Sequence, residues 1–429
     1  MTPSDPSPFD VRAVLLSGFL PATLFAIGEG AIIPIIPIAA DSLGAGLALA
    51  GFVASLILVG ELIGDVPSGV VVARIGERNA MIGAALVSVV GLLVCTAAPN
   101  PVVLSVGVFL VGLSTAVFAL ARHAYMTTAI PVRVRARALS SLGGVFRFGY
   151  FVGPFLAAGV IHLTGTTRSA FWVHVVCCLL AAGVLLVVRD PATGVRGLRR
   201  PRRASDPEAM SADPAVATDT GAVLVQQESH GLFRTIRAHS RVLVRLGSGA
   251  ALIGAMRAGR QVILPLWAVS VGLDDSTAAL VIGVAGAIDF ALFYTSGQIM
   301  DRWGRLASAL PCMLGLSVCY FLLAWSGHLD ARVGWFVAVA MAMSLANGVG
   351  SGILMTLGAD LAPRGAPAPF LGAWRFTGDL GSAAAPLLIS GVTAVASIAI
   401  ASGVMGVLGL VGAGILLRYV PRYLPRTLR

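Results

Sequence analysis

The sequence has no lysine and few charged residues of any kind. Of its 429 residues, 12% are charged and 57% are hydrophobic. A soluble domain carries about 25% charged residues, so a chain this apolar is suited to lipid rather than to water. The formal net charge of +10 rests on arginine alone, in short polar segments between apolar runs. Because these arginines form no basic stripe interleaved with aromatic residues, we expect no nucleic-acid partner.

The sequence also lacks the motifs of enzymes, metal sites and ATP-driven pumps. It contains no GxxxxGK[ST] segment, and its histidines, among them His162 and His174, have no metal-ligand spacing. We therefore expect no enzymatic activity, no cofactor and no metal. The cysteines lie inside apolar runs without paired spacing, and we interpret them as buried bystanders: Cys95, Cys177, Cys178, Cys312 and Cys319.

Twelve apolar runs are each long enough for a membrane span of about 20 residues. The first is too long for a signal peptide and predicts a retained first helix. The predicted helices are 14–40, 48–73, 79–98, 102–128, 138–163, 169–188, 242–270, 276–300, 306–326, 333–359, 368–394 and 396–418.

Arginines are concentrated in the loops after every second predicted helix and in the tail, whereas the other loops contain mainly aspartate. By the positive-inside rule this predicts an even number of spans with both termini cytoplasmic. We expect an all-α, multi-pass protein of the inner cell membrane, and a monomer. It divides into a six-helix half (1–188), an arginine-rich cytoplasmic linker (189–241) and a second six-helix half (242–429). Within the linker, 231–241 has the pattern of a short surface helix.

An internal repeat joins the two halves. One constant shift along the chain, which we call the repeat shift, aligns charged, glycine and proline positions without a gap from the first helix to the fifth of each half. Two parallel repeats predict a transporter with its substrate site between the halves, near the middle of the bilayer. The aligned pairs include Pro37 with Pro265, Gly44 with Gly272, Glu61 with Asp289, Gly69 with Gly297, Arg74 with Arg302, Gly76 with Gly304, Arg147 with Arg375, and Gly153 with Gly381.

Three segments carry a resemblance to a known family. The segment 297–305 resembles the loop motif of the major facilitator superfamily, and 69–78 resembles its first copy, with Ala73 where the family usually has aspartate. The segment 149–154 resembles the glycine–proline motif of the 12-helix drug/proton antiporters. The resemblance implies the major facilitator fold and gating roles for Gly69, Arg74, Gly76, Gly149, Gly153, Pro154, Gly297, Asp301, Arg302, Gly304 and Arg305.

Two details qualify this resemblance. These exporters commonly have an arginine in helix 4 where this chain has Val108, so its proton coupling is expected to differ. Asp301, Arg302 and Arg305 are interpreted either as a charge latch against the neighbouring half or as simple topology anchors.

Ionisable residues at membrane depth cost at least about 2.5 kcal/mol each and usually mark pathways or proton relays. In the family, helix 2 faces helix 11 and helix 5 faces helix 8. The resemblance therefore implies two ion pairs between the halves, Glu61 with Arg375 and Asp289 with Arg147. The candidates for proton coupling are Glu29, Glu61, Asp65, Asp289 and Asp379.

The helix 2–helix 11 contact contains three acids and one arginine, so at least one carboxyl is expected to hold a proton. Arg257 and Arg260 either reduce this acidic excess or attract an anionic substrate. Glu29 is assigned to the substrate cavity with these two arginines, or to a structural pair with Arg257, its repeat equivalent. Arg122 and His123 are interpreted as interfacial anchors.

The sequence thus predicts a proton-coupled, alternating-access exporter of hydrophobic or cationic small molecules such as drugs, with the small molecule, protons and the lipid bilayer as its partners. One alternative is a proton-coupled uptake symporter for an anionic or neutral solute. A second is a membrane receptor or scaffold that does not transport, although matched intramembrane charges are costly in a scaffold.

Overall fold

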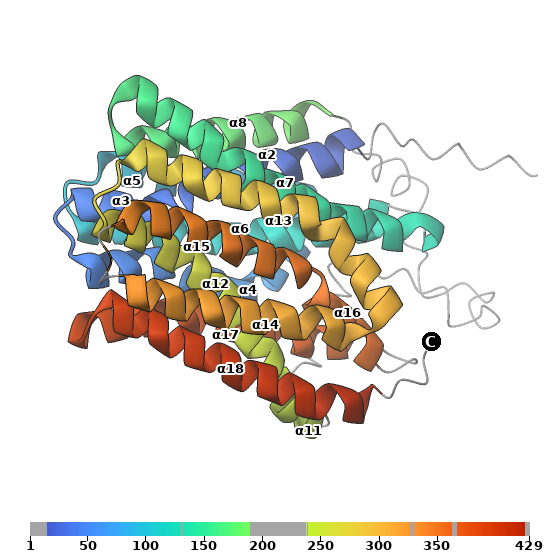
Figure 1. Cartoon of the computed structure of the whole chain (residues 1–429). Coiled ribbons are helices and arrows are strands. Elements are labelled where there is room, and N and C mark those ends of the chain that lie inside the picture. The colour runs from blue at the N-terminus through green and yellow to red at the C-terminus, as the bar shows by residue number, and fades with distance from the viewer. Residues whose placement is uncertain are drawn as a thin grey trace, which may run out of the picture.

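The computed structural model describes residues 15–129, 132–188, 237, 239–326, 329, 331–362 and 367–424. Long helices lie side by side in one bundle, and both ends of the described chain lie at the same end of it (Figure 1). That arrangement requires an even number of crossings, as the loop arginines predict. The predicted surface helix at 231–241 lies mainly outside the described residues, and a short helix, α11 (Ser240–Arg245), begins within its last two residues.

The N-terminal half begins with a helix that is interrupted beside Pro34, which has no N–H for the helical ladder. Each later expected span in this half is one long helix, apart from a short 3₁₀ turn before the last. The elements are η1 (Leu15–Phe19), α2 (Leu20–Ile32), α3 (Ile35–Ser42), α4 (Leu47–Ile75), α5 (Glu77–Ala97), α6 (Pro101–Ala129), α7 (Val132–Thr164), η2 (Thr167–Ala170) and α8 (Phe171–Val187).

The C-terminal half repeats this order with its own interruption. Its fourth expected span is broken at 350–352 into α15 and α16, where a glycine-rich segment weakens the helix. The elements are α12 (Gly247–Ser270), α13 (Asp275–Trp303), α14 (Arg305–Ser326), α15 (Arg332–Val349), α16 (Ile353–Leu361), α17 (Pro367–Val395) and α18 (Ile398–Tyr423).

Within the described residues, eleven helical segments are long and apolar enough to cross a membrane. The twelfth expected span, α12, forms a helix of 24 residues but is not among them. Arg257 and Arg260 interrupt its apolar sequence near the middle. The chain is therefore a multi-pass, all-helical membrane protein whose least apolar span carries two arginines.

The internal repeat is visible in the backbone. Four of the five glycines with positive φ form two pairs related by the repeat shift: Gly44 (84°) with Gly272 (73°), and Gly76 (82°) with Gly304 (89°). A left-handed conformation is accessible to glycine without a Cβ clash. The same turns therefore connect the first three spans of each half.

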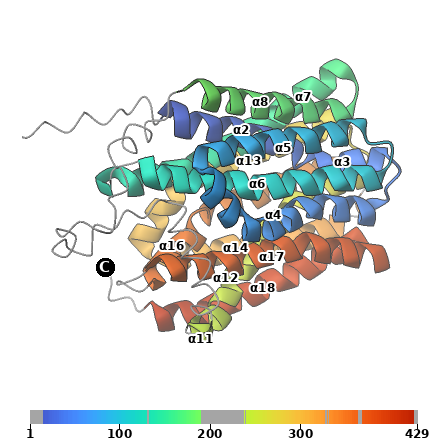
Figure 2. The same ribbon diagram turned by 180° about the vertical axis from the view of Figure 1, so that it is seen from behind.

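Two helix pairs carry most of the contact between the halves: α4 packs against α17, and α7 packs against α13. Figure 2 shows α4 and α17 on adjacent ribbons across the middle of the bundle. These contacts are the predicted helix 2–helix 11 and helix 5–helix 8 interfaces, and we call them the α4–α17 seam and the α7–α13 seam. The first is also joined by a hydrogen bond from the Ser390 hydroxyl to the Ala48 carbonyl (2.6 Å).

Candidate functional site

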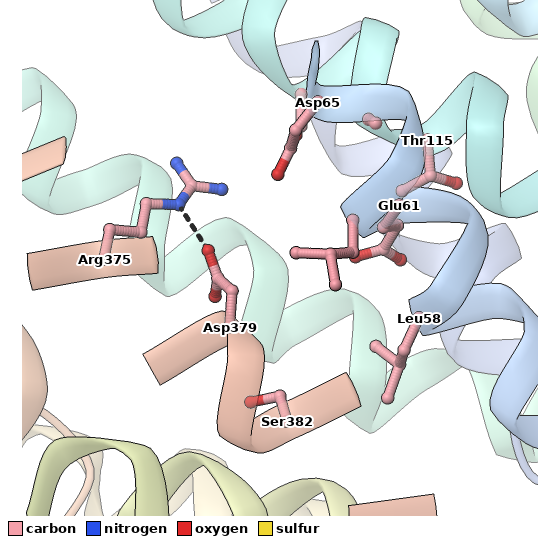
Figure 3. Close-up of a pocket in the computed structure, with 10 residues that line it drawn as sticks. Leu58, Glu61, Asp65, Thr115, Arg375, Asp379 and Ser382 are labelled. Carbon is pink, nitrogen blue, oxygen red and sulfur yellow. Dashed lines mark hydrogen bonds and ion pairs between the residues drawn. The ribbon is translucent and has the colours of Figure 1, made fainter. Parts of the chain in front are cut away.

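The α4–α17 seam contains a charged cavity of about 70 Å³. Its lining includes Glu61 and Asp65 from α4, and Arg375 and Asp379 from α17. In Figure 3 the side chains of Asp65 and Asp379 both point towards the guanidinium group of Arg375. The structure thus brings together three carboxylates and one arginine from opposite halves of the chain.

Three of the four charges in this cavity, those of Asp65, Arg375 and Asp379, are accessible to water, whereas Glu61 is half-buried. Arg375 donates from Nε to Asp379 (3.3 Å), one helical turn away on the same helix. The two side chains remain 67% and 43% exposed, respectively. Glu61 and Asp65 have no ion pair within the 4 Å limit among the described residues. The exposed Asp65 carboxylate, which has no fixed cation partner among the described residues, is free to exchange protons with water.

A second cluster is buried inside the N-terminal half. The Glu29 side chain is only 4% exposed, forms a hydrogen bond with Tyr150 and lies within electrostatic range of Arg122. Arg122 is itself 6% exposed, and its guanidinium carbon stacks 4.0 Å from the centre of the Phe146 ring. The prediction that Arg122 is an interfacial anchor is therefore wrong. Its position near the end of a predicted span suggested the surface, but packing of α6 inside the bundle buries it.

The α7–α13 seam contains a third cluster, which is rich in arginine. Asp289 of α13 forms an ion pair with Arg260 of α12, and the two side chains are only 13% and 12% exposed. Asn347 donates a hydrogen bond to the same carboxylate (3.1 Å), and Arg260 also donates to the Ser344 hydroxyl (2.7 Å). The Asp289 carboxylate is thus held by donors from its own half.

Two further arginines converge on the break between α15 and α16. Arg147 of α7 donates to the hydroxyl of Ser351 and to its carbonyl (2.7 Å), which joins the two halves. Arg257 of α12 donates to the adjacent Gly350 carbonyl. Irregular backbone at membrane depth is tolerated where its carbonyls find such partners. Both guanidinium groups are therefore held by neutral acceptors rather than by carboxylates.

A small central cavity of about 60 Å³ lies between these clusters. Its lining includes Glu61 and Tyr150 from the N-terminal half and Gln261 from the C-terminal half. Sequence reasoning missed Tyr150 and Gln261, although Gln261 is a polar residue inside an apolar run. Typical small-molecule pockets measure about 300–1,000 Å³, so a solute requires the halves to separate further than in this conformation.

The predicted ion pairs between the halves differ from the pairs in the structure. Asp289 pairs with Arg260 rather than Arg147, because α12 presents a guanidinium within the same half. Arg375 pairs with Asp379 rather than Glu61, because residues four apart share one helix face. The expected pair of Glu29 with Arg257 is also absent from the described contacts: Arg257 binds the Gly350 carbonyl, whereas Glu29 faces Arg122.

The loop motifs form contacts within each half. Arg305 forms ion pairs with Asp360 (2.7 Å) and Asp301 (3.3 Å), all in the C-terminal half. In the other repeat, Arg78 donates to the Leu185 and Val188 carbonyls at the end of α8. In this conformation the described ion pairs of Asp301 and Arg305 therefore stay within the C-terminal half and form no latch against the other half.

Of the other motif residues, Gly69 and Arg74 lie in α4 and Gly297 and Arg302 in α13, whereas the glycine–proline segment with Gly149, Gly153 and Pro154 lies within α7. A Cβ at Gly149 or Gly153 would overlap the backbone of the first span, at 26–31. These glycines allow α7 to approach α2 closely, as small residues do between membrane helices. Pro154 lies inside α7 without ending it.

A bundle of two repeated halves, with charged cavities at their interface, defines a membrane transporter rather than an enzyme. A family model described as Major Facilitator Superfamily matches residues 19–386, and the chain belongs to this superfamily. The solved structure of a D-xylose-proton symporter is similar in fold, with a TM-score of 0.73 and 16% sequence identity. The alignment covers 97% of this chain and 100% of the symporter chain.

Curated relatives match over shorter stretches. The galactose-proton symporter of Escherichia coli (strain K12) is 26% identical over 305 residues, which are 67% of this chain and 63% of the symporter. Probable inositol transporter 2 of Arabidopsis thaliana is 28% identical over 116 residues, 27% of this chain and 20% of that protein. The chain therefore matches between a fifth and two thirds of the length of these two relatives.

Proposed function

We propose that the protein is a proton-coupled symporter that takes up a small solute. The observation that carries this proposal is the α4–α17 seam, where Glu61, Asp65 and Asp379 share one cavity with a single arginine. Carboxylates at membrane depth are costly and commonly serve as proton relays. Because these three come from both halves, a change in their protonation alters the attraction between the halves.

The relatives support uptake as the direction of transport. Two similar proteins are named as proton symporters, for galactose and for D-xylose. This supports uptake, the alternative in our sequence interpretation, above drug export. In a symporter, solute and proton bind on the same side and are released together, so an inward proton gradient drives accumulation.

Proton-driven export is the second candidate. One observation favours it: Gly149 and Gly153, in the segment that resembles the antiporter motif, pack directly against the backbone of α2. A close, smooth contact between these helices suits sliding during export. The same contact also suits rigid packing of one half, so it supports export less strongly than the relatives support uptake.

Transport by the purified protein in proteoliposomes tests the proposal. Radiolabelled galactose, xylose, inositol and galacturonate are offered with the outside acidic, with the inside acidic, and with a protonophore. We expect accumulation of at least one solute with the outside acidic, and its loss with the protonophore. Accumulation only with the inside acidic would indicate antiport and overturn the symport proposal.

Variants of the three carboxylates test whether proton coupling depends on the α4–α17 seam. We expect Asp65→Asn, Asp379→Asn or Glu61→Gln to abolish gradient-driven accumulation in at least one case while solute exchange at equal pH continues. Asp274→Asn, at an exposed helix start, is the matched control and keeps full accumulation. If all three seam variants accumulate solute as the unaltered protein does, these carboxylates do not carry the proton.

A further inference from the structure

The two halves differ in charge at two pairs of equivalent positions, 29 with 257 and 122 with 350. In the N-terminal half, Glu29 of α2 lies within electrostatic range of Arg122 of α6. The repeat shift converts these positions to Arg257 of α12 and Gly350, at the end of α15. There the guanidinium group of Arg257 meets a backbone carbonyl instead of a carboxylate. The two positions thus carry no net charge in the N-terminal half, where Glu29 and Arg122 oppose each other, and a net charge of +1 in the C-terminal half, where Arg257 is the only charge of the two.

The surrounding charges do not restore the balance. Arg147, Arg257 and Arg260 lie around one carboxylate, Asp289, which forms its ion pair with Arg260. The other acids of α13 and α16, namely Asp275, Asp301 and Asp360, lie at the helix ends. Three positive charges therefore face one negative charge among the described residues of this cluster. Unpaired charge at membrane depth is unfavourable, so a bound anion would stabilise the arrangement.

Arg147 and Arg257 are also placed next to the central cavity. Arg147 is three residues before Tyr150 on α7, and Arg257 is four residues before Gln261 on α12. Residues at these spacings share one face of a helix, and both Tyr150 and Gln261 line the central cavity. One arginine from each half thus lies a single turn from the cavity, and both approach the break that begins at Gly350.

Arg257 retains unused hydrogen-bonding capacity. Its Nε atom is buried and has no hydrogen-bond partner among the described residues, and the same holds for Nε of Arg260. A guanidinium group has five N–H donors in a planar fork that matches the two oxygens of a carboxylate or phosphate. The site therefore has both the charge and the free donors that an anionic group requires.

We propose that Arg147 and Arg257 bind the carboxylate or phosphate group of the transported solute, which is a small organic anion rather than a neutral sugar. This inference rests on the proposed transport function and specifies its substrate class. The anionic group supplies Arg257 with the opposite charge that Arg122 finds in Glu29 in the N-terminal half. Because the two arginines belong to different halves, bound solute draws the halves together around it.

A matched pair of probes tests the charge directly. Galacturonate and galactose have the same ring and differ in a carboxylate at one carbon. Isothermal titration of the purified full chain in detergent, without any gradient, is expected to show binding of galacturonate, competition by inorganic phosphate, and at least roughly tenfold weaker binding of galactose. Equal binding of the two sugars, or no binding of either galacturonate or phosphate, would overturn the proposal.

Variants of the two arginines test the location. Arg257→Gln and Arg147→Gln are each expected to weaken galacturonate binding by roughly 10- to 100-fold, the range of one charged hydrogen-bonded contact. Arg257→Lys, which keeps the charge but not the fork, should restore part of the loss. Arg332→Gln, at the exposed start of α15, is the matched control and should bind as the unaltered protein does.

The outcomes separate this inference from the proposed function. Because Arg147 and Arg257 also donate to carbonyls at the break, thermal unfolding of each variant is measured beside that of Arg332→Gln, and a cooperative transition checks that the variant is folded. Unchanged galacturonate binding in both glutamine variants would overturn the proposed anion site. Normal anion binding without proton-driven uptake would leave the anion site in place and contradict only the proton coupling.

Discussion

The α4–α17 seam and the α7–α13 seam arise from the same repeat but have opposite electrostatic character. The first contains three carboxylates and one arginine, and its ion pair is 67% and 43% exposed. The second contains three arginines and one carboxylate, and the side chains of its ion pair are only 12% and 13% exposed. One seam is accessible to water and rich in proton acceptors, and the other is buried and rich in cations.

The electrostatic difference between the seams comes from charged residues that are not matched by the same kind of charge in the other half. Glu61 and Asp289 are equivalent, as are Arg147 and Arg375, so the repeat alone places one acid and one arginine at each seam. Asp65 and Asp379 then add acid at the first seam, whereas Arg257 and Arg260 add base at the second. These additions are the basis for the two roles that we propose, proton exchange at the first seam and anion binding at the second.

The largest expected effect comes from removing the buried carboxylate. Asp289→Asn leaves Arg260 without an ionic partner at 12% exposure, and we expect a loss of about 3–5 kcal/mol in the free energy of unfolding. Asp379→Asn at the exposed seam should cost less than about 1 kcal/mol, because water already solvates Arg375. Denaturant unfolding in detergent, followed by fluorescence, measures both.

A double variant separates the cost of leaving Arg260 unpaired from the cost of changing the shape of the Asp289 side chain. The double variant Asp289→Asn with Arg260→Gln removes both charges, and it should be more stable than Asp289→Asn alone. If the two seams respond equally to loss of their aspartates, the contrast in burial does not govern their energetics.

Substitutions at equivalent helix contacts should have similar effects in the two halves, whereas substitutions of the charged residues should not. Gly153 of α7 and Gly381 of α17 are equivalent, and a Cβ at either position would overlap the backbone of the neighbouring first span of its half. We expect Gly153→Ala and Gly381→Ala each to destabilise the protein by about 1–3 kcal/mol, the usual cost of overpacking. Thermal unfolding of the two variants in parallel checks the magnitude.

Two glycines on the same helices provide the controls. A Cβ at Gly159 of α7 or at Gly391 of α17 would meet no atom within 4 Å. Alanine at these positions should be neutral or stabilising, by up to about 1 kcal/mol, because alanine favours the helix. A clear difference between Gly153→Ala and Gly381→Ala would show that the packing of the halves has diverged along with their charges.

The smallest expected effect lies at a helix start where the halves differ. Asp274 caps α13 through a hydrogen bond from the Thr277 amide (2.9 Å), whereas the equivalent cap of α4 is Gly46, which has no side chain. Hydrogen bonds from Ser276 and Thr277 lower the pKa of Asp274 from 3.8 to about 2. We expect Asp274→Ala to cost about 1 kcal/mol at neutral pH.

The pH dependence of this cap has a definite sign. Because the pKa is lowered in the folded state, the contribution of the charged carboxylate is complete above about pH 4 and is lost as the pH falls towards 2. Hydrogen exchange in the first turn of α13 should therefore speed up in acid in the unaltered protein and change less in Asp274→Ala. Asp274→Asn keeps an uncharged cap and should fall between them.

Much of the architecture could be predicted from the sequence. The apolar runs placed the helices to within a few residues, except that α7 and α18 extend further than expected, and the repeat shift identified Gly76 and Gly304 as equivalent turns. The family resemblance correctly implied that α4 faces α17 and α7 faces α13. Hydropathy and the internal repeat are patterns along the sequence, so they can be recognised without knowledge of how the helices pack.

The partners of the charges were predicted less well. Arg122 was placed at the surface, and Arg147 and Arg375 were each assigned an acid that binds elsewhere or lies unpaired in this conformation. The repeat shift shows which positions are equivalent. It does not show that Asp289 forms its ion pair with Arg260 rather than with Arg147, because that choice depends on the rotation of α12 about its axis.

The sequence alone determined that this protein lies in a membrane, that it consists of two parallel repeats, and that acids and arginines occur at membrane depth. These properties follow from composition and spacing, which hydrophobic burial and backbone hydrogen bonding convert directly into helices. Only the tertiary structure decided which charges share a cavity and which are held by carbonyls at the break at 350–352. Those choices depend on differences of a few ångströms between packed helices, because charged groups in a low-dielectric interior interact strongly only with the partners they can reach.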